Sequence, residues 1–186
     1  MTRPNVAVFV GSLSARSINR RLSLALQAAG RDLFSFSTVN IDYLPLYNRD
    51  LDQDLPPAVK RLKAQVQEAD ALLFVTPEYN RSVPSALKNA LDWGSRPYGA
   101  SVWRGKMAAV AGASVGALGT AVAQTHLRTV LMHLDVVTLP QPELYVKVTD
   151  ALLTETGEVL DPDFERLLAD FMRRFSVLVA SANGRT

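Results

Sequence analysis

The chain has 186 residues, of which 48% are hydrophobic, 20 are basic and 18 are acidic. This length and composition suit one compact domain with a substantial core, so we expect residues 1–186 to form a single domain. The sequence has no cysteine, which excludes disulfides, zinc–thiolate sites, iron–sulfur clusters and a cysteine nucleophile. The net charge of +2 is spread along the chain and predicts no nucleic-acid partner.

Neither the start of the sequence nor its apolar runs predict targeting or membrane insertion. Residues 1–5 are too short and too polar for the core of a signal peptide. The apolar runs stay below the roughly 18 residues that are needed to cross a bilayer. With cysteine also missing, we expect a cytoplasmic protein without a membrane partner.

Apolar runs alternate with amphipathic segments along the whole chain. The runs predict strands at residues 6–11, 34–41, 71–76, 107–114 and 135–139. The segments between and after them predict helices at about residues 18–29, 55–69, 84–93, 118–132 and 162–180. This alternation predicts a flavodoxin-like doubly wound α/β fold, in which a five-stranded parallel sheet of order 2-1-3-4-5 carries helices on both faces.

The first expected strand ends in the segment "GSLSARSIN" (residues 11–19), which opens a helix. Ligands of doubly wound folds bind beyond the carboxyl ends of the strands, and a helix N-terminus offers free N–H groups to an anion. The segment lacks the glycine spacing of a triphosphate loop or of a dinucleotide loop. A simple helix cap is the alternative reading for Ser17. The polar side chains predict a cradle for one terminal phosphate: Ser12, Ser14, Ser17 and Asn19.

A second candidate segment follows the third expected strand, in "TPEYNRSVPSALKNALDW" (residues 76–93). Prolines stiffen both ends of this loop, and Ser82 or its neighbour is expected to cap the next helix. Tyr79 offers a flat ring, and Asn80 offers a donor and an acceptor to a planar heteroaromatic edge. These groups are suited to form a wall for a flavin ring. The alternative is structural, with Glu78 facing solvent and Tyr79 sealing the core.

The segment after the fourth expected strand, "GASVGALGT" (residues 112–120), repeats this logic. Gly116 and Gly119 remove side chains where the backbone could pass close to a flat ligand. The alternative is a helix start that needs conformational freedom, because glycine is common in any such turn.

Together the three segments resemble the NADPH-dependent FMN reductase family, in particular its quinone and chromate reductase branch. The likeness extends through "THLRTVL" and "TGEVLD" over nearly the whole chain. It implies that the FMN phosphate is held by Ser12, Ser17 and Asn19. It also implies that the isoalloxazine ring is bordered by Pro77, Glu78, Tyr79 and Asn80, with Ser114 and Gly116 completing the far wall.

The sequence departs from the family pattern at two places. Similar sequences have Arg where this chain has Ser14, so Arg16, two positions later, is the candidate for that contact with the phosphate. They often have Gly where this chain has Thr120, directly after Gly119. Both departures concern how tightly FMN is held.

The resemblance implies an FMN-dependent oxidoreductase. Bound FMN would accept hydride from NADPH or NADH and pass electrons to a quinone, chromate or a similar small acceptor, which alternates with the nucleotide in one place. No acid–base residue is required. His126 and His133 are expected to be packed or surface residues rather than metal ligands, because no carboxylate set accompanies them. Since flavodoxin-type carriers are usually strongly acidic, the charge of +2 argues against the alternative, an FMN electron carrier.

The segment "GSRPYGASVW" (residues 94–103) bears on assembly. Trp93, Tyr98 and Trp103 lie in or beside this loop of small residues and are expected to need cover, since monomers rarely expose large apolar patches. The resemblance implies a homodimer or a homotetramer. The alternative is that these rings fold back on their own domain.

Overall fold

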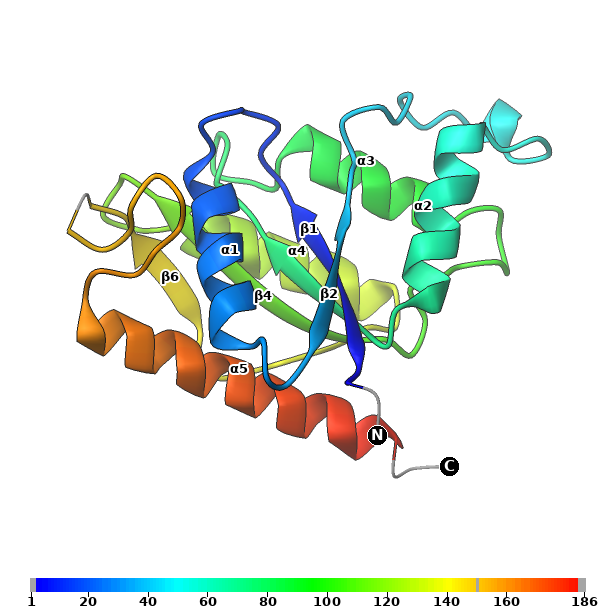
Figure 1. Cartoon of the computed structure of the whole chain (residues 1–186). Coiled ribbons are helices and arrows are strands. Elements are labelled where there is room, and N and C mark those ends of the chain that lie inside the picture. Colours follow the sequence, from blue (N-terminus) through cyan, green and yellow to red (C-terminus); the bar gives the residue numbers. More distant parts are fainter. Residues whose placement is uncertain (1–2, 150, 184–186) are drawn as a thin grey trace.

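In the computed structural model, which describes residues 3–149 and 151–183, a parallel sheet lies between two layers of helices (Figure 1). None of the described helices is both long and apolar enough to cross a bilayer. The elements in chain order are β1 (Asn5–Val10), α1 (Ile18–Ala29), β2 (Ser35–Val39), a 3₁₀ turn η1 (Arg49–Leu51), α2 (Pro57–Glu68), β3 (Ala71–Val75), α3 (Ser85–Gly94), β4 (Met107–Ser114), α4 (Ala121–His133), β5 (Val137–Thr138), β6 (Leu144–Lys147) and α5 (Pro162–Asn183).

The sheet has the order β2-β1-β3-β4-β5, which confirms the predicted topology. Every paired strand runs parallel to its neighbour; Val6, for example, lies opposite Phe36 of β2 and Ala71 of β3. Parallel strands bring their carboxyl ends to one edge of the sheet. The loops that follow β1, β3 and β4 therefore open at the same edge.

The fifth position of the sheet differs from the prediction. We expected one strand at residues 135–139, but two short strands share this place along β4. Val137 of β5 lies opposite Met107, and Leu144 of β6 lies opposite Ala111. The segment between them contains two prolines, which have no N–H group to donate to the ladder, so the strand is interrupted there. The prediction of a single strand at residues 135–139 therefore missed β6.

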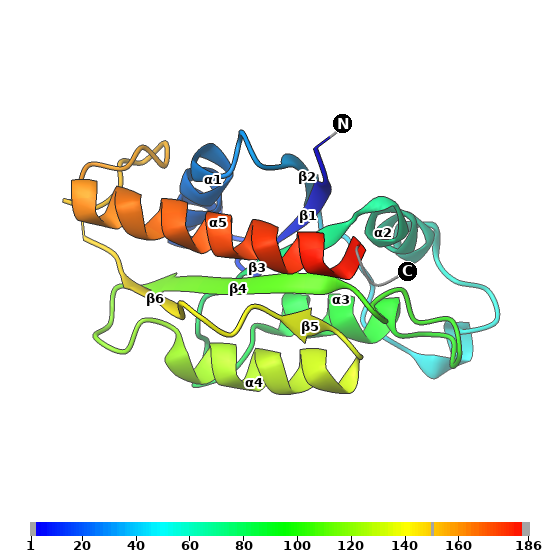
Figure 2. The same ribbon diagram turned by 90° about the horizontal axis from the view of Figure 1, so that it is seen from below.

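The two faces of the sheet have separate cores. Val6 and Val8 of β1 point into a core that is shared with α1 and α5. Ala7 and Phe9 point into a second core, which is built with α2, α3 and α4. Figure 2 shows α5 and α4 on opposite sides of β4. The sheet is thus covered on both faces, which leaves its carboxyl edge as the natural place for a ligand.

The tryptophans beside the loop at residues 94–103 are covered by their own domain. Trp93 and Trp103 are fully buried, and their Nε1–H groups donate to the carbonyl oxygens of Pro45 at 2.7 Å and Leu91 at 2.9 Å. Only Tyr98 is open to solvent, with 94% of its surface exposed. The expectation that these two tryptophans need a partner subunit is therefore wrong, and the alternative holds for them.

Lys63 of α2 also holds the loop at residues 94–103 in place. Its Nζ donates to the carbonyl oxygens of Ala100 at 2.7 Å and of Arg96. Burial lowers the pKa of Lys63, and the charge of Asp52 acts in the opposite direction. The loop is held by the domain itself and needs no partner for its order.

Candidate functional site

The three predicted segments meet at the carboxyl edge of the sheet and contact one another directly. The hydroxyl groups of Ser12, after β1, and Tyr79, after β3, lie 3.3 Å apart. Asn19 at the start of α1 bonds to Ala113 near the end of β4. Glu78, after β3, bonds to the N-terminus of α4. The segments therefore form one connected site rather than three independent loops.

The loop between β1 and α1 has the features of a phosphate cradle. Ser17 caps α1 by accepting a hydrogen bond from the Arg20 N–H at 3.2 Å, which leaves its hydroxyl hydrogen free to be donated. Among the described residues, nothing accepts from the backbone N–H groups of Leu13, Ser14 and Ala15. These N–H groups lie in the loop just before α1, and together with the positive end of the helix they fit a phosphate dianion. The cap and the phosphate contact are compatible roles for Ser17.

Asn19 has a structural bond that the sequence did not predict. The residue is 1% exposed; its Nδ2 donates to the Ala113 oxygen at 2.9 Å, and its Oδ1 accepts from the Ala113 N–H at 2.8 Å. This pair of bonds ties the start of α1 to β4. The donor that Asn19 offers to a phosphate is therefore chiefly its backbone N–H, in the first turn of the helix.

Arg16 is exposed and lies on the outer side of the cradle. It lines a cavity of about 350 Å³ together with Ser17, Arg20 and Arg21. Arg20 also lines a larger cavity of about 550 Å³ beside Ser12. Arg20 was not among the predicted site residues, but it lies beside Arg16 and Ser17 in the lining of the smaller cavity.

The loop between β3 and α3 contains a tight turn. Tyr79 and Ser82 exchange backbone hydrogen bonds of 3.1 and 2.9 Å, and the residues between them, Asn80 and Arg81, have φ angles of +49° and +63°. Positive φ at both central positions is the geometry of a type I′ turn, which favours Asn first and Gly second. Arg81 is strained at this second position. Tyr79 is half exposed and presents its ring beside the loop after β1.

Ser82 does not cap α3, contrary to expectation. The N-cap position belongs to Pro84, whose side chain has no hydrogen-bonding atom. The Ser82 hydroxyl instead lies 3.1 Å from Nδ1 of His126 on α4. His126 is therefore engaged in a link between α4 and this loop. Among the described residues, no group of three or more His, Asp or Glu side chains could hold a metal ion.

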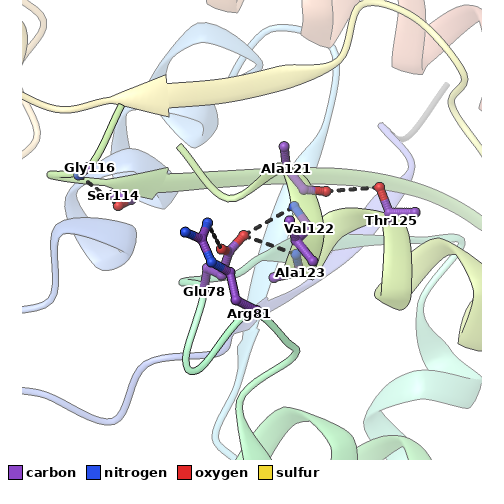
Figure 3. Close-up of polar contacts among 8 residues, drawn as sticks. All are labelled: Glu78, Arg81, Ser114, Gly116, Ala121, Val122, Ala123 and Thr125. Atoms are coloured by element: carbon purple, nitrogen blue, oxygen red, sulfur yellow. Dashed lines mark hydrogen bonds and ion pairs between the residues drawn. The ribbon is translucent and has the colours of Figure 1, made fainter. Parts of the chain in front are cut away.

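Glu78 points away from solvent, and its side chain is only 10% exposed. Its Oε2 accepts from the backbone N–H groups of Val122 and Ala123, both at 3.1 Å, and its Oε1 pairs with the guanidinium of Arg81 at 3.3 Å (Figure 3). The alternative in which Glu78 faces solvent is wrong. The carboxylate caps a helix that begins on the far side of the site.

The loop between β4 and α4 is shaped by two different glycines. Gly119 has φ of +58°, and a Cβ there would lie 2.9 Å from the backbone of Tyr145, so the protein itself requires glycine. A Cβ at Gly116 would meet only the Ser114 hydroxyl, which accepts from the Gly116 N–H at 2.9 Å. The open side of Gly116 thus remains available to a ligand.

The tyrosine that faces Gly119 lies in a partly buried environment. Burial raises the pKa of Tyr145, and Glu143 acts in the same direction.

The comparisons with known proteins agree with this geometry. The NADPH-dependent FMN reductase family matches residues 4–150. A 2-hydroxy-1,4-benzoquinone reductase from a Burkholderia species is 48% identical over 174 residues, which cover 94% of this chain and 95% of that protein. A quinone reductase from Pseudomonas putida is 43% identical over 173 residues, which cover 92% of each.

A solved structure leads to the same family. FerB, a flavoenzyme NAD(P)H:(acceptor) oxidoreductase from Paracoccus denitrificans, is 40% identical, and its structure matches 96% of this chain and 98% of its own with a TM-score of 0.93. The resemblance inferred from the motifs is thereby confirmed. The chain belongs to the NADPH-dependent FMN reductase family and is a flavodoxin-like oxidoreductase.

Proposed function

We propose that this protein is an FMN-dependent NAD(P)H:quinone oxidoreductase. The observation that supports this most is the direct connection of the loops after β1, β3 and β4, at the edge where the strand order reverses. In open α/β sheets that edge is where a flat cofactor binds. FMN, when bound, accepts hydride from a nicotinamide and delivers electrons to a second substrate. The protein has to bind and orient these partners.

The phosphate of FMN is proposed to lie at the start of α1. Ser12 and Ser17 would donate through their hydroxyl groups, and Asn19 through its backbone N–H. Arg16 would add positive charge from the outer side, together with the neighbouring Arg20. This arrangement provides the charge that the pattern of related sequences places at Ser14.

The isoalloxazine ring is proposed to lie between the loops after β3 and β4. Pro77, Tyr79 and Asn80 would border one side, and Ser114, Gly116 and Gly119 would border the other. Tyr79 supports this role because its ring is half exposed while its hydroxyl lies against Ser12. The resemblance also placed Glu78 at the ring. Its side chain would instead support the two loops without touching the flavin, because it bonds to Arg81 and to the start of α4.

The acceptor is proposed to be a small benzoquinone, with a hydroxylated benzoquinone as the first candidate. The support is the identity of 48% with a relative named for 2-hydroxy-1,4-benzoquinone. Chromate is the second proposed acceptor, because the sequence resembles the quinone and chromate reductase branch of the family. NADPH is the proposed donor from the family description, with NADH as the alternative. We also propose that the protein is cytoplasmic, where NADPH and NADH are present.

A screen of donors and acceptors without oxygen tests this function. NADPH and NADH would each be paired with 2-hydroxy-1,4-benzoquinone, 1,4-benzoquinone and chromate, and initial rates measured over a grid of both concentrations. We expect turnover with the quinones and parallel double-reciprocal lines, because the two substrates alternate in one place. Turnover with no quinone under either nucleotide would contradict the proposal. It would favour the electron-carrier alternative if FMN still bound.

The phosphate cradle can be tested apart from the helix cap, because Asp is also a good cap. Ser17→Asp should keep the thermal stability of the apoprotein, since Asp accepts from the same N–H. It should weaken FMN binding roughly a hundredfold or more, because a carboxylate would face the phosphate. Titration by flavin fluorescence, with Ser17→Thr as the conservative control, measures this. Equal FMN affinity in Ser17→Asp and the wild type would show that the phosphate does not bind beside Ser17.

We also propose that the protein forms a homodimer or a homotetramer. The buried tryptophans no longer support this, but exposed apolar side chains beside the site do. Leu13, Val115 and Leu118 are 51%, 75% and 54% exposed. Light scattering at micromolar concentration should give a multiple of 20.3 kDa. A mass of one chain, with full reductase activity, would contradict the proposal.

A further inference from the structure

One carboxylate joins two loops of the site. Glu78 lies in the loop after β3, but its Oε2 accepts from Val122 and Ala123, the second and third residues of α4. These are the N–H groups that an N-cap side chain normally satisfies. Thr120 holds the N-cap position, but its hydroxyl accepts from Nε2 of Gln124 at 2.9 Å. The cap of α4 is therefore provided by a residue 44 positions earlier in the chain.

The second oxygen of the same carboxylate holds a strained turn. Arg81 has a positive φ at a position that favours glycine, at a cost of roughly 1–2 kcal/mol. Its guanidinium lies 3.3 Å from Oε1 of Glu78 and is two-thirds exposed, so the pair alone is a weak bond. Figure 3 shows both contacts meeting at the one side chain. Glu78 thus positions the tip of one loop and the start of the helix behind the other.

The charges at this place are close to balance. The N-terminus of a helix carries about half a positive charge, and Arg81 carries a full one. Glu78 adds one negative charge, and its side chain is largely shielded from solvent, so its field is only partly screened. Without Glu78, the helix end and the guanidinium would both present positive charge beside the proposed place of the flavin ring. Positive charge stabilises a reduced flavin, which carries more negative charge than the oxidised form.

We propose that Glu78 is a positioning residue of the reductase with two separable effects. Its bonds to α4 hold the loops after β3 and β4 at a fixed spacing, and its charge offsets α4 and Arg81 so that the midpoint potential of bound FMN is lowered. The second effect rests on the proposed place of the flavin. The first concerns the apoprotein alone. A role in protein stability only would predict neither a shift in potential nor its sign.

The first arm of the test uses the apoprotein. In Glu78→Ala, amide hydrogen exchange at Val122 and Ala123 should become roughly tenfold faster or more, because both N–H groups lose their acceptor. In Glu78→Gln the amide oxygen can still accept, so exchange should stay closer to the wild type. Unchanged exchange in Glu78→Ala would overturn the positioning role. This result does not depend on FMN.

The second arm compares midpoint potentials of the FMN-loaded proteins. Glu78→Gln should shift the potential in the positive direction, and Arg81→Gln should shift it in the negative direction. The double variant should return close to the wild type, and Glu165→Gln, an exposed site on α5 at the other face of the sheet, should change nothing. Shifts of the same sign in Glu78→Gln and Arg81→Gln, or no shift, would overturn the electrostatic role. Failure of the wild type to bind FMN would instead reject the proposed function, and the exchange arm would still decide the positioning role.

Discussion

The parallel pairing of β1, β3 and β4 is the constraint on which the site depends. Because the three strands run in the same direction, the loops that follow them open at one edge of the sheet. Residues that are far apart in sequence then come within bonding distance: Ser12 reaches Tyr79, and Asn19 reaches Ala113. Buried or partly buried hydrogen bonds of this kind fix the loops before any ligand arrives, which lowers the entropy cost of binding.

Several polar residues of the site have a structural role, and two of them, Ser17 and Asn19, also have a proposed contact with the phosphate. Ser17 caps α1, Asn19 ties α1 to β4, and Glu78 caps α4. Oδ1 of Asn19 and Oε2 of Glu78 accept from backbone N–H groups, and a buried N–H group without an acceptor is costly. A cofactor site built from such residues is rigid, but it also couples stability to binding. Variants here therefore need an apoprotein measurement beside any measurement of activity.

Much of the fold could be predicted because buried parallel strands read as continuous apolar runs, as "ALLFV" of β3 does. The positions of the three loops followed from the same pattern. The bonds between loops could not be predicted, since the sequence does not show which N–H group Glu78 or Asn19 reaches. The burial of Trp93 and Trp103 was missed for a similar reason, because the carbonyl groups that accept from them are set by tertiary packing. The break between β5 and β6 was readable in principle from Pro140 and Pro142.

One bound FMN is proposed to connect a nicotinamide nucleotide to a quinone. The most direct measurement is an anaerobic titration of the FMN-loaded protein, followed through the visible absorbance of oxidised flavin. About one equivalent of NADPH or NADH should remove this absorbance, and one equivalent of benzoquinone should restore it, since each transfers two electrons. If neither nucleotide bleached the flavin while light-driven reduction did, the protein would be an electron carrier rather than a reductase.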